Sequence, residues 1–265
     1  KIMTKSLSVI IPCLNAESLI YKKVIKLNKR LTNLKIKFEI IVINDGSKDN
    51  TLRELLRLKK KLKSVKCVNY KRNKGKSYII KKNINKTKFN NVVLVDCDLP
   101  YFQVFRTVVN KLLAGYDLVI VNRRHKKSRV QKGSIHAYQI IRLFIGNIIG
   151  KLSCFLLNID ISGSDTQAGL KGLRKFPKFK NLHFISEKFF LDLEIIYHYL
   201  KMKKKIFSVP VIFKIPKKSS IKIFSLKNFE IINELMRVII ALNFSNKNLH
   251  LLRKSKNKNT IIKNF

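Results

Sequence analysis

The sequence predicts an α/β fold in which helices cover both faces of a mostly parallel sheet. Along the first half, short runs rich in Val, Ile and Leu alternate with segments whose apolar residues recur every three or four positions. The runs themselves are almost continuously apolar, which is typical of parallel strands that are buried on both faces. At 265 residues, the chain is long enough to form one large domain of this kind.

Five strands are expected in the first half, and a helix should follow each of the first four. The strand segments are SLSVIIP, FEIIVIND, VKCVNY, NVVLVD and DLVIVN. The helix after the first strand carries an apolar stripe formed by Ile20, Val24, Leu27 and Leu31. Strands that alternate with helices in this way predict a parallel arrangement.

Local signals predict where the later helices begin. Ser47 or Asp49 is expected to cap the second helix, which should run to about Leu62. Gly75 should open the third helix. Four apolar residues should line the helix after the fourth strand: Phe102, Phe105, Val109 and Leu112.

A strongly apolar helix is expected over residues 139–158. Its small and polar residues form one narrow stripe: Gln139, Arg142, Gly146, Gly150 and Ser153. A membrane-spanning helix would have to bury Arg142 and Lys151, each at a cost of about 2.5–3.5 kcal/mol. Two alternatives remain, a helix packed in the protein core and the favoured one, a helix lying in the membrane interface.

The rest of the chain is expected to complete a single domain over residues 1–246. The loop SGSDTQAGLKGLRK leads to a helix from Phe189 to Met202, and the strand KIFSVPVIF follows. The Lys- and Asn-rich tail at 247–265 should be weakly ordered.

The charge of the chain is extreme, with 57 Lys and Arg against 15 Asp and Glu, a formal net charge of +42. Solvated faces of a chain rich in Lys, Asn and Ile, an anionic membrane surface, and nucleic acid all fit such a charge. The lysines are scattered, and no ladder of basic and aromatic residues suited to base stacking is present. We therefore expect a membrane surface as a partner and no nucleic acid.

Cysteine usage predicts a reducing compartment. Cys13, Cys67, Cys97 and Cys154 are far apart and form no CxxC motif, so neither zinc nor a disulfide framework is expected. The first residues, KIMTKSLSVIIP, run directly into a strand and lack a signal-peptide cleavage site. A cytoplasmic protein associated peripherally with a membrane is the expectation.

Two aspartates end the fourth strand of a chain that is poor in acid. In an extended chain, residues two apart point to the same face, so Asp96 and Asp98 should converge while Cys97 points into the fold. Such hard oxygen ligands suit Mg²⁺ or Mn²⁺ bound together with a diphosphate. The other predicted strands also end in polar residues, and ligands of parallel sheets bind at this edge.

Four segments resemble the successive motifs of family-2 glycosyltransferases with the GT-A fold: SVIIPCLNAES, IIVINDGSKDNT, RNKGKSYIIKK and VVLVDCDLP. The resemblance covers about residues 6–125 and implies that this half binds a nucleotide sugar and a metal. It implies contacts to the base and ribose from four residues: Pro12, Asn15, Glu17 and Asp45. It also implies that Lys76 lies near the sugar-nucleotide and that Asp96 and Asp98 hold Mg²⁺ or Mn²⁺.

Motifs in the second half resemble the polyprenyl-phosphate (dolichyl-phosphate) glycosyltransferases, and most of all their β-glucosyl branch. The segments are DLVIVNRRHKKSRV, SDTQAGLKGLRK, FLDLEIIYHYL and SVPVIFKIPKKSSIKIF. The resemblance implies that residues 126–246 bind a polyprenyl phosphate acceptor, with UDP-glucose favoured as donor and GDP-mannose as the alternative. The usual Gly-Ser-Arg after the fifth strand is here Val121-Asn122-Arg123, and DCDLP departs from the branch's usual continuation.

A phosphate acceptor and a hydroxyl acceptor require different catalytic groups. A lipid phosphate is already an anion and needs only to be held in line, a task that suits Arg123. A hydroxyl acceptor needs a general base, for which Asp165 is the candidate. Asp165 and Gln167 otherwise suit a helix cap and a loop anchor. A related enzyme acting on a saccharide or lipid hydroxyl therefore remains the alternative, and a basic nucleic-acid-binding protein is a third reading.

Overall fold

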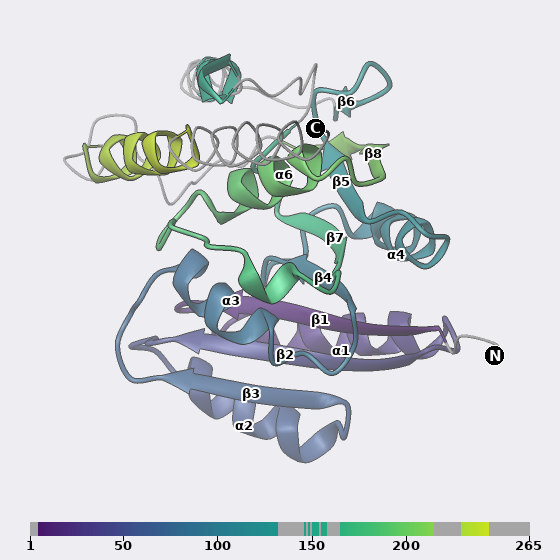
Figure 1. Cartoon of the computed structure of the whole chain (residues 1–265). Helices are drawn as coiled ribbons and strands as arrows, with labels where there is room; N and C mark the ends of the chain where they lie inside the picture. Colours follow the sequence, from purple (N-terminus) through teal and green to yellow (C-terminus); the bar gives the residue numbers. More distant parts are fainter. Residues whose placement is uncertain are drawn as a thin grey trace, which may run out of the picture.

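A seven-stranded sheet forms the centre of the protein (Figure 1). The computed structural model of the protein describes residues 5–131, 146, 148, 150–153, 155–157, 165–214 and 229–243. In the order β3-β2-β1-β4-β7-β5-β8, the strands are β3 (Val65–Tyr70), β2 (Lys37–Asp45), β1 (Ser6–Cys13), β4 (Asn91–Val95), β7 (Leu170–Arg174), β5 (Leu118–Asn122) and β8 (Ile206–Pro210). β7 runs antiparallel to both neighbours, and the other pairs are parallel. The predicted mostly parallel sheet and its first five strands are confirmed.

The predicted strand over residues 205–213 is divided in two. β8 ends at Pro210, and β9 (Ile212–Phe213) pairs in parallel with β6 (Arg129–Val130) in a separate two-stranded sheet. The turn around Val211 therefore carries the chain from the main sheet to the small one.

Helices cover both faces of the main sheet. α1 (Ile20–Thr32), α2 (Thr51–Lys61) and α4 (Phe105–Leu113) pack on one face. α3 (Lys76–Ile84), α6 (Leu191–Lys201) and a helix at 229–243 pack on the other. Side chains alternate between the two cores along each strand, so Val9 and Ile11 contact one helical layer and Ile10 the other. This double burial explains why the strands are almost continuously apolar.

The predicted apolar stripe of the first helix is confirmed, because Ile20, Val24, Leu27 and Leu31 are all buried in α1. The predicted cap of the second helix is wrong: the residue before α2 is Asn50 rather than Ser47 or Asp49. The carboxylate of Asp49 nevertheless accepts a hydrogen bond of 3.0 Å from the Thr51 N–H, because Asp readily bonds to the backbone two residues on.

The predicted lining of the fourth helix is right for Phe105, Val109 and Leu112, which are buried in α4. It is wrong for Phe102, which lies in the preceding 3₁₀ turn η1 (Phe102–Val104) and stacks on Phe105 at 5.8 Å between ring centroids. Tyr101, just before η1, has a left-handed backbone conformation, so the chain reverses there before α4 begins.

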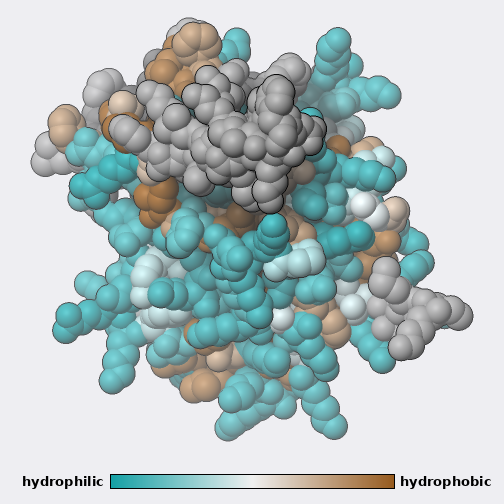
Figure 2. Space-filling view, viewed as in Figure 1, coloured by the Kyte–Doolittle hydropathy of each residue, from teal (hydrophilic) through white to brown (hydrophobic). Residues whose placement is uncertain are grey.

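Two helical segments expose apolar faces near one end of the molecule (Figures 1 and 2). The first surface helix comprises the described helical residues 146, 148, 150–153, 155 and 156 of the predicted 139–158 helix, and the second surface helix is 229–243. In the first, the small residues Gly150 and Ser153 face the protein while Ile148, Leu152 and Phe155 are exposed. The remainder of 139–158 and the tail 247–265 lie outside the described residues.

The second surface helix has a similar division. Four exposed apolar residues follow one another at helical spacing: Phe229, Ile232, Met236 and Ile240. Its opposite face packs into the core through Leu235, Val238, Ile239 and Leu242. In the described part of the chain, none of the helices combines the length and apolarity that crossing a membrane requires.

Candidate active site

The sheet brings several polar residues to one edge. β1, β2, β4 and β5 point in the same direction, so their carboxyl ends lie at the same edge. Pro12, Asp45, Asp96 and Arg123 lie at or just after these ends. β7 is antiparallel and starts at this edge, with Leu170 opposite Val95. The segment before β7, which contains Asp165 and Gln167, therefore joins the same rim.

Asp96 and Asp98 lie in a turn and not in an extended chain as expected. The N–H of Leu99 donates to the Asp96 carbonyl at 2.9 Å, and Leu99 adopts a left-handed conformation. The two carboxylates still interact: partial desolvation and then the charge of Asp96 raise the pKa of Asp98 above its ordinary value. Cys97 packs against the core as expected.

The turn is closely packed against the segment before β7. The Asp96 N–H donates to the Gly169 carbonyl at 2.9 Å. A Cβ atom at Gly169 would collide with Oδ2 of Asp96, so the absence of a side chain at Gly169 leaves room for this carboxylate.

Lys76 occupies the first turn of α3 and reaches Asp96. Its Nζ lies 2.6 Å from Oδ1 of Asp96. Burial opposes the charged form of Lys76, but the charges of Asp96 and Asp192 outweigh burial and raise its pKa above its ordinary value. The resemblance-based expectation placed Lys76 near a sugar-nucleotide, and the fold places it beside the paired aspartates.

Asn15 and Glu17 hold the loop after β2. The N–H of Asn15 donates to Ser47 Oγ and its Oδ1 accepts from the Lys48 N–H, both at 2.9 Å. Oε2 of Glu17 accepts from the Asn50 N–H at 2.6 Å. These bonds join the first two motifs into one surface, and Pro12 lines a small cavity next to it together with Lys76 and Asp96.

Asp45 is buried and fixes the start of α3. Its two carboxylate oxygens accept hydrogen bonds from the Lys74 N–H at 2.8 Å and the Gly75 N–H at 3.0 Å. Gly75 has a φ of 98° and a Cβ there would lie 2.5 Å from the Glu187 carbonyl oxygen, which explains the glycine. Contact of Asp45 with a nucleotide remains a prediction.

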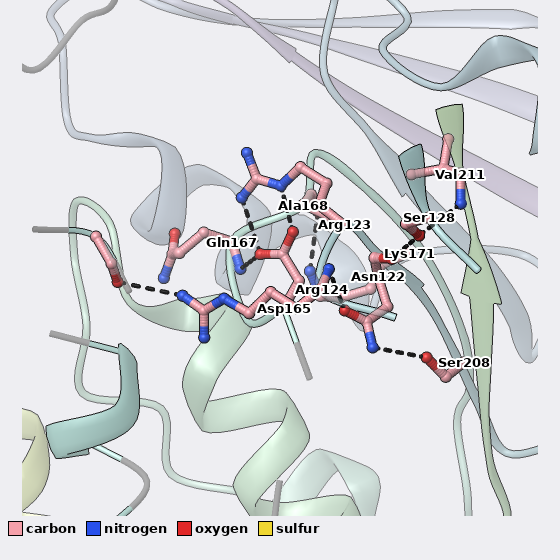
Figure 3. Close-up of polar contacts among 11 residues, drawn as sticks. Asn122, Arg123, Arg124, Ser128, Asp165, Gln167, Ala168, Lys171, Ser208 and Val211 are labelled. Atoms are coloured by element: carbon pink, nitrogen blue, oxygen red, sulfur yellow. Dashed lines mark hydrogen bonds and ion pairs between the residues drawn. The ribbon is translucent and has the colours of Figure 1, made fainter. Parts of the chain in front are cut away.

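Arg123 and Asp165 form a two-pronged ion pair (Figure 3). Arg123 Nη2 donates to Oδ1 of Asp165 at 2.8 Å, and Nε donates to Oδ2. The Gln167 N–H adds a bond of 3.0 Å to the same carboxylate, while the Gln167 side chain is exposed. Burial favours the neutral acid, but the bonds and charge of Arg123 hold the pKa of Asp165 below its ordinary value. Asp165 is therefore an ionised partner of Arg123.

Arg124 connects this rim to the first surface helix. Its Nη2 donates to the Gly146 carbonyl at 3.2 Å, and its guanidinium lies directly against Gly150, where a Cβ would be 2.8 Å away. Asn122 supports the turn from the other side, because its Oδ1 accepts from the Arg124 N–H and its Nδ2 donates to Ser208 Oγ. Gly150, one of the small residues of the predicted helix, thus makes room for Arg124.

Sequence reasoning assigned no role to Lys171. This side chain is 1% exposed in the middle of the sheet, and its Nζ lies 3.1 Å from Oδ1 of Asp192 and 3.0 Å from the Ala168 carbonyl. A lysine inside the apolar segment AGLKGL was the available signal. Within the described residues, no group of three or more His, Cys, Asp or Glu side chains is arranged to hold a metal ion.

In the described part of the chain, the sheet order, its antiparallel strand β7 and the rim at its carboxyl edge define a protein of the GT-A fold class. More particularly, the chain belongs to glycosyl transferase family 2, whose family model matches residues 8–189. The family resemblance of the sequence motifs is thereby confirmed.

Several curated relatives have related sequences. An uncharacterized glycosyltransferase of Synechocystis sp. is 34% identical over 154 residues, which cover 57% of this chain and 46% of the relative. A dolichyl-phosphate beta-glucosyltransferase of Dictyostelium discoideum is 30% identical over 223 residues, which cover 77% of this chain and 65% of the relative. A dolichyl-phosphate beta-glucosyltransferase of Trichomonas vaginalis is 29% identical over 178 residues, which cover 62% of this chain and 52% of the relative. The chain spans about half the length of several of these relatives.

Solved structures share the fold at lower identity. Glucosyl-3-phosphoglycerate synthase of Mycobacterium tuberculosis, in complex with Mn²⁺, UDP and phosphoglyceric acid, has a TM-score of 0.60 at 18% identity, covering 91% of this chain and 78% of that one. TarS of Staphylococcus aureus in complex with UDP-GlcNAc has a TM-score of 0.58 at 19% identity, covering 89% and 66%. These similarities establish the GT-A architecture.

Proposed function

We propose that the protein is an inverting glycosyltransferase that moves a hexose from a nucleotide sugar to a polyprenyl phosphate. UDP-glucose is the favoured donor and GDP-mannose the alternative. The observation that carries this proposal is the Arg123–Asp165 ion pair at the rim. The similarity to two dolichyl-phosphate beta-glucosyltransferases supports it.

The ion pair favours a phosphate acceptor over a hydroxyl acceptor. A hydroxyl acceptor needs a base that takes its proton, and a base works best when its pKa is near the operating pH. The pKa of Asp165 is displaced in the opposite direction, and both its oxygens bond to Arg123. A phosphate monoester carries its own negative charge and needs orientation instead.

Arg123 is the proposed orienting group for that phosphate. Nε and Nη2 are engaged by Asp165, which fixes the plane of the guanidinium, and Nη1 makes no bond to Asp165. A fixed guanidinium suits the geometry of phosphate oxygens. Gln167, exposed next to Asp165, completes the proposed acceptor side of the site.

The paired aspartates fit a divalent cation that is shared with the donor. Asp96 and Asp98 present carboxylates at one turn, and the ammonium of Lys76 on Asp96 indicates that the position attracts a cation. Two protein carboxylates with phosphate oxygens are a usual ligand set for Mg²⁺ and also suit Mn²⁺. Bound there, the metal would act as a Lewis acid that neutralises the departing diphosphate. Pro12, Asn15, Glu17 and Asp45 are the proposed contacts to base and ribose.

The two surface helices are the proposed contact with the membrane. Both expose apolar side chains toward one end of the molecule (Figure 2). An exposed apolar helix face combined with many basic residues is typical of proteins that lie on an anionic bilayer. We therefore propose peripheral association with the cytosolic membrane face, where a polyprenyl phosphate is accessible. Nucleic acid has no proposed role.

A transfer assay tests the proposal directly. The purified protein is incubated with Mn²⁺, a panel of UDP- and GDP-sugars, and either undecaprenyl phosphate, dolichyl phosphate or simple sugars as acceptors. We expect glycolipid formation with a polyprenyl phosphate and one nucleotide sugar, and its loss in Asp98→Asn. Transfer to a sugar hydroxyl without transfer to either lipid phosphate would establish the alternative enzyme.

A further inference from the structure

Four charged residues of alternating sign line one small cavity at the carboxyl ends of β1 and β4. They are Asp96, Lys76, Asp192 and Lys171, and apolar atoms of the sheet complete the walls. They come from four different segments: the turn after β4, the first turn of α3, the first turn of α6, and β7. The cavity therefore joins the proposed metal site to the helix α6.

Two ion pairs divide these charges in the structure. Lys76 Nζ lies 2.6 Å from Asp96, and Lys171 Nζ lies 3.1 Å from Asp192. The Lys171 side chain is 1% exposed and that of Asp192 is 15% exposed. A buried ammonium is strongly destabilising without an opposite charge, so breaking the Lys171–Asp192 pair is unfavourable. The pair therefore keeps Asp192 at the cavity wall.

Lys76 is the member of this group that can move. Its side chain is 39% exposed, and a lysine ammonium sits on a flexible four-carbon stem. Asp96 and Asp192 line the same cavity, and both charges act on Lys76. A second carboxylate thus lies within reach of the ammonium.

Metal binding would create a conflict at Asp96. The ammonium of Lys76 occupies Oδ1 of Asp96, and a divalent cation on Asp96 and Asp98 would repel it at such short range. We infer that Asp192, fixed by Lys171, receives the Lys76 ammonium when a cation occupies Asp96 and Asp98. Asp192 and Lys171 are then positioning residues for the metal site, an inference that rests on the proposed function.

Mn²⁺ titration of the purified full chain, followed by calorimetry without any donor, tests this exchange. In Asp192→Asn, Lys76 loses the second carboxylate that lines the cavity, so the affinity for Mn²⁺ should fall about tenfold, within the range for groups in one network. Asp192→Glu should restore most of it. Lys76→Gln removes the competing ammonium and should raise the affinity above that of the wild type.

The combination of both changes is the discriminating measurement. In Lys76→Gln/Asp192→Asn, residue 76 carries no ammonium that could move to residue 192. The affinity for Mn²⁺ should therefore equal that of Lys76→Gln alone. A merely structural role of Asp192 would weaken binding by the same factor in both backgrounds. Such additive losses would overturn the inference.

A second variant separates the exchange from misfolding. Asp192→Asn leaves Lys171 buried without its partner, whereas Lys171→Met/Asp192→Asn removes both charges. We expect this double variant to unfold cooperatively on heating and to show the same tenfold loss of Mn²⁺ affinity. Wild-type affinity in the folded double variant would overturn the inference.

The Asp98→Asn variant distinguishes an error in the proposed metal site from an error in the proposed exchange of Lys76 between carboxylates. If this variant binds Mn²⁺ as tightly as the wild type, the proposed metal site is wrong and the inference falls with it. If Asp98→Asn loses Mn²⁺ while the Asp192 variants bind normally, the exchange alone is wrong.

Discussion

Oppositely charged side chains from distant segments are paired along the rim of the sheet. Among the residues that the structure describes, three pairs lie there: Lys76–Asp96, Lys171–Asp192 and Arg123–Asp165. Each pair limits the directions in which the remaining donors of the cation can point. The geometry of the site is thus a property of pairs, and single substitutions should be interpreted with the partner in mind.

Asp98→Asn should abolish most transfer while the fold stays intact. The change removes one negative charge from the proposed metal site and keeps the size of the side chain. Electrostatic contacts of this kind contribute roughly 10²–10³ in rate. Initial rates with saturating Mn²⁺ and a circular dichroism spectrum measure the two effects. Near-normal turnover in the folded variant would reject the metal assignment.

The Arg123–Asp165 pair should behave as one unit in acceptor binding. Arg123→Ala should raise the acceptor KM and lower kcat with little change in the donor KM. Arg123→Lys should recover only part of the lost acceptor binding and kcat, because a point charge lacks the two-pronged contact. Asp165→Asn should be milder and act mainly through the acceptor KM, since no proton has to be removed from a phosphate. Steady-state kinetics with each substrate varied separately give these values.

Stability is the control for this pair, because removing one partner of a buried ion pair costs about 3–5 kcal/mol. Arg123→Ala/Asp165→Asn avoids a lone buried charge and should transfer no more slowly than Arg123→Ala alone. Near-complete loss of kcat in folded Asp165→Asn, together with normal kinetics in Arg123→Ala, would instead identify Asp165 as the base of a hydroxyl-acceptor enzyme.

At the scale of elements, the start of α3 depends on a loop from the second half of the chain. The first N–H groups of a helix have no partners within it. Here the N–H of Tyr78 donates to the Glu187 carbonyl at 2.8 Å, and the N–H of Ser77 donates to the Lys188 carbonyl. Glu234, from the second surface helix, accepts from the N–H groups of Glu187 at 2.7 Å and Lys188 at 2.6 Å. The second surface helix is thereby connected to the segment that carries Lys76.

Glu234→Ala should loosen this connection. Glu234 also accepts from Ser186 Oγ at 2.9 Å and from the Phe189 N–H at 3.2 Å, both partly buried. Partly buried donors left without an acceptor cost about 1–3 kcal/mol, so stability should fall within that range. Hydrogen exchange at the Ser77 and Tyr78 amides should accelerate more than exchange in α1. Glu230→Ala is the matched control. Glu230 lies on the same surface helix as Glu234 and makes an exposed ion pair with Lys188, which contributes little to stability. Unchanged exchange at both amides would show that the loop holds α3 without Glu234.

At the scale of the whole molecule, the proposed catalytic rim and the two exposed apolar helix faces are connected. The first surface helix contacts Arg124 next to the proposed acceptor side, and the second reaches the α3 segment through Glu234. A protein that takes a lipid substrate from a bilayer needs its site close to its membrane-contacting surface. The contacts place the two within the same part of the fold (Figure 1).

The protein should bind anionic vesicles as a peripheral protein. Basic residues near such a surface contribute about 1 kcal/mol each, so high salt should release part of the bound protein. Leu152→Asp/Phe155→Asp should release more, because both side chains are exposed and apolar. Leu56→Asp, at an equally exposed position on α2, is the control and should bind normally. Vesicle co-sedimentation measures the binding of the wild type, the double variant and the control. A wild type that does not bind vesicles would contradict the membrane proposal.

Much of the architecture could be predicted because its signals are local. The stripe from Ile20 to Leu31, the near-continuous apolar strands and the glycine before α3 depend on residues close together in the chain. The same holds for Asp96 and Asp98, whose place after an apolar strand predicts the rim. The turn that contains them was missed, because a left-handed conformation at Leu99 leaves no clear signal in a leucine.

The sequence by itself determined the strand–helix alternation, the apolar faces that form both cores, and the acidic and basic motifs at the strand ends. Only the tertiary structure decided which of these motifs meet. It places β7 between β4 and β5, although β7 follows both in the chain, and thereby brings Lys171 to the cavity behind Asp96. It also pairs Arg123 with Asp165 across 42 positions. Periodicity reports which face of an element is buried, whereas contacts between distant charges depend on how the whole sheet is ordered.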